Sequence, residues 1–333
     1  MNDRAVSLLE QYDVEILRTR KGRGAIICDT DRGCLIYKEY SGNENRIATQ
    51  NALLTHIGRQ GKVNVEEILP TREGALFVKD SEGTQYVLKT YCEGRECDIS
   101  EREECLEAVL LLAKLHESTE GFGVNFPASL SKEYEKRNRE LKKVRKFLKQ
   151  RSQKTLFEIQ LLHNFDFFLE QALGVAEEWG YYEKEVLGAS DVSLQGFCHG
   201  DYQYHNILKT ERGWFLINFE KCVADDPIRD LYLFLRKLLE KSNWSVSLGK
   251  EILNAYEKER PIPAISRIDL YYRLAYPEKF WKIVNFYYNS GKAWIPERNG
   301  EKLTRLIDQE TEKQAFLEEV FQTPHFKGKI DEK

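Results

Sequence analysis

This sequence of 333 residues lacks the features that mark several common classes of protein. No apolar run approaches the ~20 residues needed to cross a bilayer, and the N-terminus lacks the long apolar core of a signal peptide. The formal net charge is only −4, which argues against a general nucleic-acid binder. We therefore expect a protein that folds in the cytosol, has no membrane span and binds no nucleic acid.

Cysteine is scattered along the chain. None of the seven cysteines forms part of a zinc-finger pattern, because the pair Cys92 and Cys97 has no second pair to complete a site. Reduced thiols in a cytoplasmic protein are the simplest interpretation. The chain also has no internal repeat, no low-complexity linker and no G-x-G-x-x-G segment, so its organisation must be taken from the pattern of apolar residues.

That pattern predicts a β-rich beginning. With 41% hydrophobic and 12% aromatic residues, the chain can bury a sizeable core. One helix is expected at about 43–59, where Ile47, Leu53, Leu54 and Ile57 form an apolar stripe. Strands are expected at 13–20, 24–30, 34–40, 65–71 and 84–91.

After residue 100 the pattern becomes helical, and Ser100 and Glu103 predict a capping box at the first helix. Helices are expected at 100–119, 132–154, 156–171, 172–186, 229–240, 246–258, 266–288 and 300–321. The predicted class is α+β. Its parts are a β-rich nucleotide lobe at 1–91, a hinge at 92–99, a helical lobe at 100–325 and a frayed tail at 326–333.

The segment FCHGDYQYHNIL, residues 197–208, carries the chemistry. Asp201 and Asn206 have the Asp-x-x-x-x-Asn spacing of kinase catalytic loops. In such loops the carboxylate orients the attacking hydroxyl, and the amide oxygen binds a metal ion beside the nucleotide. The alternative is a surface turn in which His199 is a hydrogen-bonded core residue, but the flanking apolar residues favour the kinase interpretation.

Together with WFLINFEKC (214–222) and DDPIRDLYLFLRK (225–237), this motif resembles the aminoglycoside phosphotransferase and choline kinase superfamily. ILPTREG (68–74), YVLKTYCEGRECD (86–98) and LAKLHEST (112–119) are similar, more closely, to the CotS family of bacterial spore coat proteins. The resemblance runs from about residue 5 to 320. It implies a two-lobed, protein-kinase-like fold with a small β-rich N-terminal lobe and a large helical C-terminal lobe.

The resemblance assigns roles to single residues. Asp201 matches the catalytic aspartate, and Asn206 matches the metal-binding asparagine. His199 supports the loop, and Asp230 matches a buried aspartate that braces it by hydrogen bonds. Asp230 can also be read as an ordinary acid near the start of a helix, where the helix dipole favours it.

Asn218 stands where these kinases usually have a metal-binding aspartate. The amide removes a full negative charge, and Mg²⁺ prefers carboxylates, so ATP and Mg²⁺ are expected cofactors with weakened binding. In an extended segment, Glu220 would point to the same face as Asn218 and could supply the missing carboxylate. Otherwise Glu220 is solvated or pairs with Lys221 or Arg229.

Two lysines could contact phosphate. Lys38 lies in a strand that precedes a helix, as the phosphate-binding lysine of kinases does, and we prefer it to Lys89, which runs into the hinge; the alternative for Lys38 is a solvated lysine. The acid expected on the following helix is doubtful. Glu44 lies too early, and Gln50 stands near a plausible facing position.

The stretch 132–154 has eleven Lys or Arg residues against three Glu, a balance of +8. A helix there would turn Leu141, Val144 and Leu148 toward the body and expose its cations. The exposed side is either a solvated face or a docking surface for an acidic partner.

Two functions remain open. The resemblance implies assembly into the spore coat from the mother-cell cytoplasm, together with other coat proteins, by a protein whose ATP site is degenerate. The alternative is an active ATP-dependent phosphotransferase acting on a small hydroxyl- or amine-bearing molecule or on a coat protein. Antibiotic modification has the least support, because the sequence identifies no acidic pocket for a cationic drug.

Overall fold

The computed structural model describes residues 7–22, 24–122, 130–187, 196–289 and 297–322. The chain forms two compact units. The first comprises Met1–Asn125, Gln195–Phe234 and Ala255–Pro261, and the second comprises Phe126–Leu194, Leu235–Asn254 and Ile262–Lys333. The predicted tail at 326–333 lies outside the described residues.

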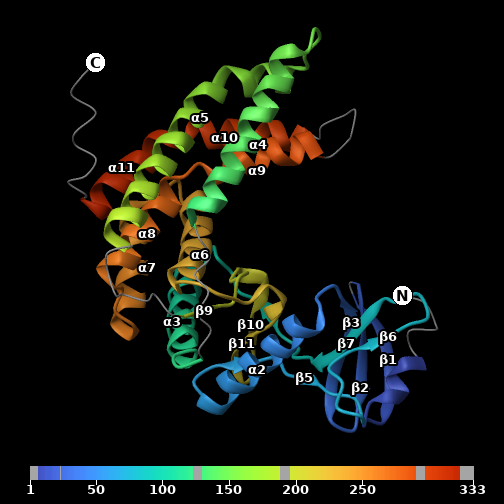
Figure 1. Cartoon of the computed structure of the whole chain (residues 1–333). Coiled ribbons are helices and arrows are strands. Elements are labelled where there is room, and N and C mark those ends of the chain that lie inside the picture. Colours follow the sequence, from blue (N-terminus) through green and yellow to red (C-terminus); the bar gives the residue numbers. More distant parts are fainter. Residues whose placement is uncertain (1–6, 23, 123–129, 188–195, 290–296, 323–333) are drawn as a thin grey trace. The chain divides into compact units, whose positions relative to one another are not determined.

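A six-stranded antiparallel sheet forms the N-terminal part of the first unit (Figure 1). Its order is β1 (Ile16–Gly22), β2 (Ala25–Thr30), β3 (Gly33–Tyr40), β7 (Gln85–Thr90) and β5 (Ile68–Leu69), and β6 (Val78–Lys79) also pairs with β7. The sequence predicted the first three strands and β7. It did not predict β6, and the expected strand at 65–71 is two short strands that belong to different sheets.

The two faces of this sheet have different roles. Leu35 and Tyr37 on β3 turn to one face, where they join a buried core with Tyr86 and Leu88 of β7. The opposite face carries the two lysines, because Lys38 pairs in register with Val87, two residues before Lys89. The alternation of β-strands therefore places both ammonium groups on the face away from this core.

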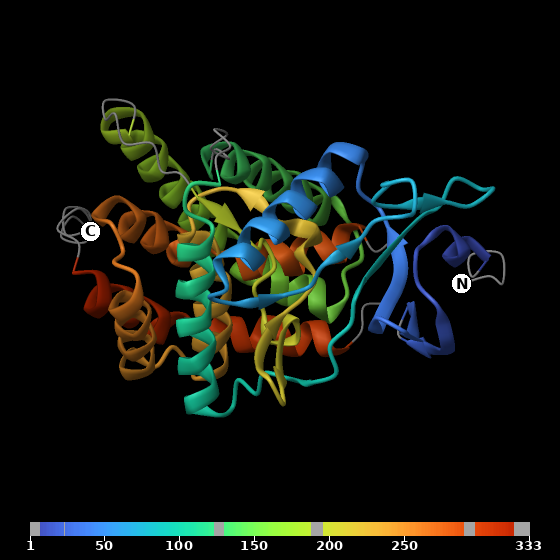
Figure 2. The same ribbon diagram turned by 90° about the horizontal axis from the view of Figure 1, so that it is seen from below.

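Helix α2 (Glu44–Gln60) follows β3 directly. The Asn43 side chain caps its first turn, and Gly61 ends it in the left-handed region with φ 66°. Its neighbours include α3 (Arg102–Ser118), as Figures 1 and 2 both show, and the turn η4 (Phe219–Lys221). The capping box predicted for α3 is wrong. Its N-cap is Glu101 without a side-chain bond, because Ser100 donates instead to Asp98.

Short strands complete the first unit. A four-stranded sheet has the order β4 (Asn64–Val65), β11 (Gly213–Leu216), β10 (Ile207–Thr210) and β8 (Arg95–Glu96), and β9 (Phe197–Cys198) pairs with β12 (Val223–Ala224). The 3₁₀ turns η1 (Leu8–Gln11) and η3 (Tyr204–Asn206) precede β1 and β10. The loop from β9 to β10 contains Asp201, and β11 leads into η4.

The second unit is helical, and α6 and α7 contribute residues to both units. Its helices are α4 (Leu130–Gln150), α5 (Leu156–Tyr182), α6 (Ile228–Lys241), α7 (Val246–Glu259), α8 (Ala264–Ala275), α9 (Glu278–Asn289), α10 (Glu297–Asp308) and α11 (Glu310–Phe321), with a π turn η2 (Glu183–Leu187) after α5. Helices α4 and α5 lie side by side (Figure 1). The α+β class with a β-rich N-terminal and a helical C-terminal region is confirmed.

Three predicted helix boundaries are wrong. The two helices predicted at 156–171 and 172–186 are one continuous α-helix, α5, which ends at Tyr182. It begins with a capping box between Thr155 and Glu158. The single helix predicted at 266–288 is broken in two, because Tyr276 takes an extended conformation before Pro277. The stretch predicted at 300–321 is also two helices, α10 and α11.

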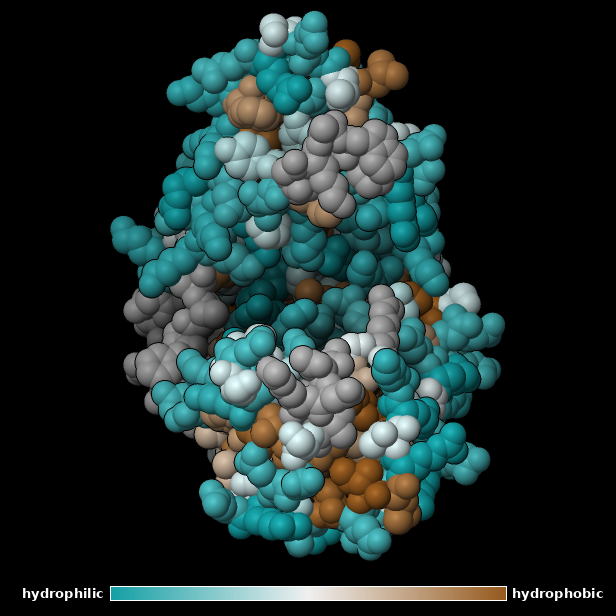
Figure 3. Space-filling view, turned by 90° about the vertical axis from the view of Figure 1, so that its right-hand side faces the viewer, coloured by the Kyte–Doolittle hydropathy of each residue, from teal (hydrophilic) through white to brown (hydrophobic). Residues whose placement is uncertain are grey.

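Hydrophilic side chains cover most of the face in Figure 3, with hydrophobic residues gathered in patches. Among the described residues, the exposed hydrophobic side chains include Leu156 on α5, at 86%. All seven cysteines are free thiols. Within the described ranges no helix is both long and apolar enough to span a membrane.

A glycine in α7 permits close packing with α11, which generates a test of this fold. A Cβ at Gly249 would lie 2.3 Å from Cε2 of the fully buried Phe316. We expect Gly249→Ala to lower the free energy of unfolding by roughly 1–3 kcal/mol through overpacking. Gly174→Ala is the matched control, because a Cβ at Gly174 in α5 meets nothing within 4 Å; it should gain up to about 1 kcal/mol from helix propensity. Equal effects of both changes in urea unfolding would contradict the α7–α11 contact.

Candidate functional site

Close backbone packing and hydrogen bonds of His199 fix the start of the loop from His199 to Asn206. Gly200 has φ 78°, and a Cβ there would lie 2.0 Å from the carbonyl oxygen of Lys221, so only glycine fits. The Asp201 N–H donates to Nδ1 of His199 at 3.2 Å. Nε2 of His199 must then carry the proton, which it donates to the Ile217 carbonyl at 2.9 Å. Both ring nitrogens of His199 are therefore hydrogen-bonded, and the side chain joins the loop to Ile217, the residue after β11.

Asp230, in the first turn of α6, fixes the backbone of this loop. Its two carboxylate oxygens accept the N–H groups of His199 at 2.6 Å and Gly200 at 2.9 Å. His116 of α3 lies 3.4 Å from the same carboxylate. Burial raises the pKa of Asp230, but His116, His199 and the Gly200 N–H outweigh burial and hold the pKa below its ordinary value. The ionised carboxylate therefore braces the loop.

Asp201 is the reachable carboxylate of the loop, with 18% of its side chain exposed. Oδ1 accepts a hydrogen bond from Nε2 of Gln203 at 2.9 Å, and Oδ2 accepts one from Nζ of Lys221 at 2.9 Å. A substrate hydroxyl that approaches Asp201 would have to compete with the Lys221 ammonium.

Three polar side chains form a hydrogen-bonded ladder that begins at Asn206, the last residue of this loop. Asn206 donates to the Asp201 carbonyl at 2.8 Å, so its Oδ1 is left to accept, and Asn218 donates to that oxygen at 2.8 Å. Lys38 in turn donates to Oδ1 of Asn218 at 2.9 Å. The structure thus brings Lys38, Asn206 and Asn218 together, next to Asp201.

The sequence interpretation assumed that the segment 218–220 is extended, and this assumption is wrong. Asn218 has φ 66°, in the left-handed region that asparagine tolerates, and it begins the η4 turn. The turn directs Glu220 to the lysines of the sheet, where its carboxylate and the Asn218 amide oxygen share the Lys38 ammonium.

The Glu220 carboxylate bridges both lysines. Its Oε1 lies 2.7 Å from Nζ of Lys38 and 2.7 Å from Nζ of Lys89. The partners suggested from the sequence, Lys221 and Arg229, are wrong, since Lys221 pairs with Asp201 and Arg229 pairs with Asp225. Burial raises the pKa of Glu220, but Lys89 and Lys38 outweigh it and lower the pKa to about 2.

The two lysines differ in exposure. The Lys89 side chain is 1% exposed and also pairs with Glu66 at 2.9 Å, whereas the Lys38 side chain is 22% exposed. Burial lowers the pKa of Lys89, but Glu66 and Glu220 outweigh it and hold the pKa above its ordinary value. Lys89 is thus an internal ion-pair partner, and only Lys38 is accessible to a ligand.

The sequence interpretation missed two residues of this network. Glu66 accepts the Phe219 N–H at 3.0 Å as well as Lys89, so it fixes the η4 turn. The signal for Glu66 was an acidic residue inside a predicted strand. Arg46 of α2 donates to the Glu220 carbonyl at 2.9 Å.

Helix α2 was expected to supply an acidic partner for Lys38, but its acidic residue, Glu44, does not contact Lys38. Glu44 is exposed in the first turn of α2. Gln50, one turn after Arg46 on the same face, is fully buried. Neither polar atom of the Gln50 side chain has a partner among the described residues. Glu220 therefore replaces a helix acid as the partner of Lys38.

The residues present do not fit a magnesium ion. Mg²⁺ needs hard oxygen ligands, usually one or two carboxylates. The two amides are hydrogen-bonded to each other, the Glu220 carboxylate is held by two ammonium groups, and the Asp201 carboxylate is held by Lys221. Among the described residues no three His, Cys, Asp or Glu side chains group to hold a metal.

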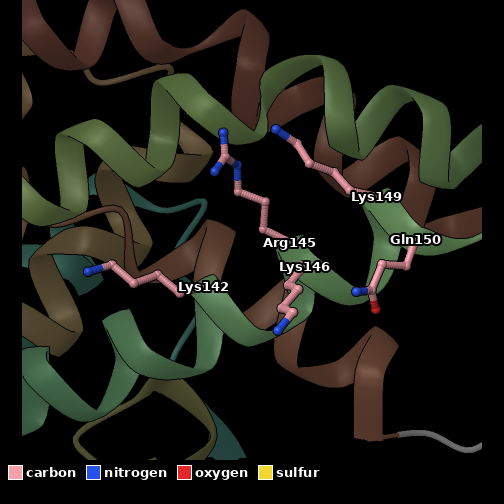
Figure 4. Close-up of a pocket in the computed structure, with 5 residues that line it drawn as sticks. All are labelled: Lys142, Arg145, Lys146, Lys149 and Gln150. Carbon is pink, nitrogen blue, oxygen red and sulfur yellow. The ribbon is translucent and has the colours of Figure 1, made fainter.

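A second candidate surface lies on α4, in the other unit. Leu141, Val144 and Leu148 are buried, as the sequence predicted. A groove on the exposed side is lined by Lys142, Arg145, Lys146, Lys149 and Gln150, which project from α4 in Figure 4. Arg145 and Lys149 share one carboxylate, Asp166 of α5. On this basic face, defined by the five lining residues, four cations face one carboxylate in the ion pairs of the described part of the chain.

The fold is that of the kinase-like aminoglycoside phosphotransferases. An aminoglycoside phosphotransferase from Alicyclobacillus acidocaldarius superposes with a TM-score of 0.81 at 21% identity, over 95% of both chains. A spectinomycin phosphotransferase with ADP and spectinomycin has a TM-score of 0.65 at 12% identity, over 94% of this chain and 97% of its own. An amicoumacin kinase with AMP-PNP and Ca²⁺ has a TM-score of 0.56 at 13% identity, over 92% and 89%. At these identities the likeness concerns the fold.

Within that class, the chain belongs to the family described as "Spore coat putative kinase YutH", whose pattern matches residues 6–320. It is also 24% identical to "Spore coat protein S" of Bacillus subtilis (strain 168) over 322 residues, which cover 92% of this chain and 89% of that protein. The expected membership of a spore coat family with a kinase-like fold is confirmed.

The pKa of Glu220 generates a pH test. Because the pKa is lowered to about 2 in the folded chain, the ion pairs stabilise it above pH 4.5, and that contribution is lost as the pH falls from 4.5 toward 2. We expect Glu220→Gln to lower the free energy of unfolding at pH 7 on the order of 2 kcal/mol. The difference from the wild type should shrink below pH 4.5 in urea unfolding. Glu39→Gln, which removes a carboxylate at an exposed position on β3, is the control for loss of one charge outside the cluster, and a constant difference between Glu220→Gln and the wild type across this pH range would contradict the ion-pair assignment.

Proposed function

We propose that this protein acts in assembly of the spore coat and that its kinase-like site does not transfer phosphate. The observation that carries the proposal is the hydrogen bond between Asn218 and Asn206, which uses both amides that a metal ion would need. Membership of a spore coat family supports the coat role. Other coat proteins are the proposed partners, reached from the mother-cell cytoplasm.

The site residues take defined roles in this proposal. Asp201 is the remnant of the carboxylate that orients a phosphate acceptor. Lys38 faces the phosphates. Asn206, Asn218 and Glu220 occupy the position where a kinase binds its metal ion, and they are bonded to each other or to lysines instead. His199 and Asp230 hold the loop in place. We also propose residues 1–91 as the nucleotide lobe, 92–99 as the hinge and 100–325 as the helical lobe.

An active phosphotransferase is the second candidate, and Asp201 favours it. Its carboxylate is partly exposed in a braced loop, and the bond to Lys221 is to a side chain that is itself 64% exposed. Two solved relatives of the same fold contain ADP, or AMP-PNP with Ca²⁺. An acceptor with a hydroxyl or amine, either a small molecule or a coat protein, would then displace Lys221 from Asp201.

The basic face of α4 is the proposed contact with the coat. Within the described ranges, Arg145 and Lys149 of this face share the carboxylate of Asp166, so an acidic segment of another coat protein is the complementary occupant. The nearby aromatic side chains Phe147 and Tyr288 are in edge-to-face contact with each other, and Lys143 lies over the Tyr288 ring, so they are already occupied. The recognition we propose is therefore electrostatic.

A pair of fusions separates the two candidate functions. Fluorescent fusions of the wild type and of Asp201→Ala should both appear during sporulation and ring the forespore, because assembly needs the fold and not the carboxylate. The purified wild type should release or transfer no phosphate from ATP. Transfer by the wild type that is abolished in Asp201→Ala would contradict the proposal and establish the phosphotransferase, and a uniform signal in growing cells would contradict the coat role.

The docking face has a charge-matched test. Replacing Lys142, Lys146 and Lys149 by Gln should reduce recruitment to the forespore. At about 0.5 kcal/mol for each exposed charge, affinity for an acidic partner should fall about tenfold. The control removes the same charge from exposed lysines of other helices, Lys114, Lys258 and Lys302. Equal recruitment of the two triple variants would show that the exposed side of α4 is a solvated face and not a docking surface.

A further inference from the structure

The amide of Asn218 takes the place where a kinase needs a cation. In kinases, metal ions bridge the phosphate oxygens and neutralise their charge, and an aspartate and an asparagine hold them. A carboxylate at position 218 would set an oxygen against Oδ1 of Asn206, and two acceptors so close repel each other unless a cation or a donor lies between them. Asn218 presents an N–H instead, 2.8 Å from that oxygen. The gap that a metal ion would bridge is closed by a hydrogen bond.

The charge of the surrounding network favours an anion. Among the described residues it contains four cations, Lys38, Arg46, Lys89 and Lys221, and three carboxylates, Glu66, Asp201 and Glu220, which leaves a net charge of +1. With an aspartate at 218 the same network would be neutral. Asp230 does not offset this charge at the surface, because it is fully buried and its oxygens face backbone N–H groups and His116.

Lys38 is free to turn to an anion because Glu220 has a second partner. An ammonium group has three donors, and two of those on Lys38 are directed at Glu220 and Asn218. If Lys38 shifts toward a ligand, Lys89 stays 2.7 Å from Glu220, so no buried carboxylate is left unpaired. The partial exposure of Lys38, at 22%, gives a ligand access to it.

We propose that this site binds the phosphates of a nucleoside di- or triphosphate directly on Lys38, without a divalent cation. The proposal rests on a site that does not transfer phosphate, and it adds the ligand and its independence of metal. The shared chemistry is a chain of two or three phosphates, for which a nucleotide and an inorganic polyphosphate are the two sources.

Calorimetric titration of the full chain tests the metal requirement. ATP, ADP and tripolyphosphate are each titrated in EDTA and again in Mg²⁺. We expect ATP to bind in EDTA with a Kd within threefold of its value in Mg²⁺, or tighter. Tighter binding of ATP than of tripolyphosphate would identify a nucleotide as the ligand, and equal binding would identify the phosphate chain alone.

Variants assign the binding to Lys38 and Asn218. Lys38→Gln should weaken ATP binding in EDTA at least tenfold, and Lys38→Arg should retain it because the charge is kept. Lys21→Gln, which removes an exposed lysine from β1 of the same sheet, is the matched control and should bind as the wild type does. Asn218→Asp should reverse the metal dependence, with ATP binding at least tenfold tighter in Mg²⁺ than in EDTA.

Three results would overturn the inference: no ATP binding in EDTA when Mg²⁺ supports it, no binding of any of the three ligands, or equal ATP binding by Lys38→Gln and Lys21→Gln. None of these results bears on the coat role, which is tested by localisation. Phosphate transfer by the wild type would contradict the proposed function, whatever the metal dependence of binding.

Discussion

The carboxylate of Glu220 joins the turn after β11 to two lysines on neighbouring strands of the N-terminal sheet. Because Lys89 is almost fully buried, its charge must be compensated inside the protein, and Glu66 and Glu220 do this together. Glu66 also accepts the Phe219 N–H, so the ion pairs fix the backbone that carries Asn218. The geometry of the whole site follows from this buried cluster of charges.

A single exchange of oxygen for nitrogen then decides what the site can hold. An aspartate and an asparagine offer oxygens that converge on a cation, whereas two asparagines can satisfy each other. The structure has the second arrangement, with Lys38 completing the ladder at 2.9 Å. The loop from His199 to Asn206 is braced by Asp230 and His199 all the same, so the kinase-like fold is kept although the two amides are bonded to each other.

The class of fold and most of the elements could be predicted from the sequence, because alternation in strands and the 3.6-residue period in helices are local signals. The errors occurred where local signals are weak or conflict. Tyr276 and Pro277 interrupt an apolar pattern that otherwise continues, and Ser100 bonds Asp98 instead of capping α3. The three short strands β4, β8 and β12 exist only because partners far along the chain pair with them.

For the site, the sequence by itself determined the motif from His199 to Asn206, the amide at 218 and the membership of a kinase-like class, since these are read from residue types at fixed spacing. Only the tertiary structure decided which charges meet. The choice between Lys38 and Lys89, the partner of Glu220 and the part played by Glu66 depend on contacts across 23 to 182 positions of the chain. The conformation of Asn218 likewise follows from the turn that these contacts hold, because a left-handed residue is favoured by its surroundings and not by its neighbours in sequence alone.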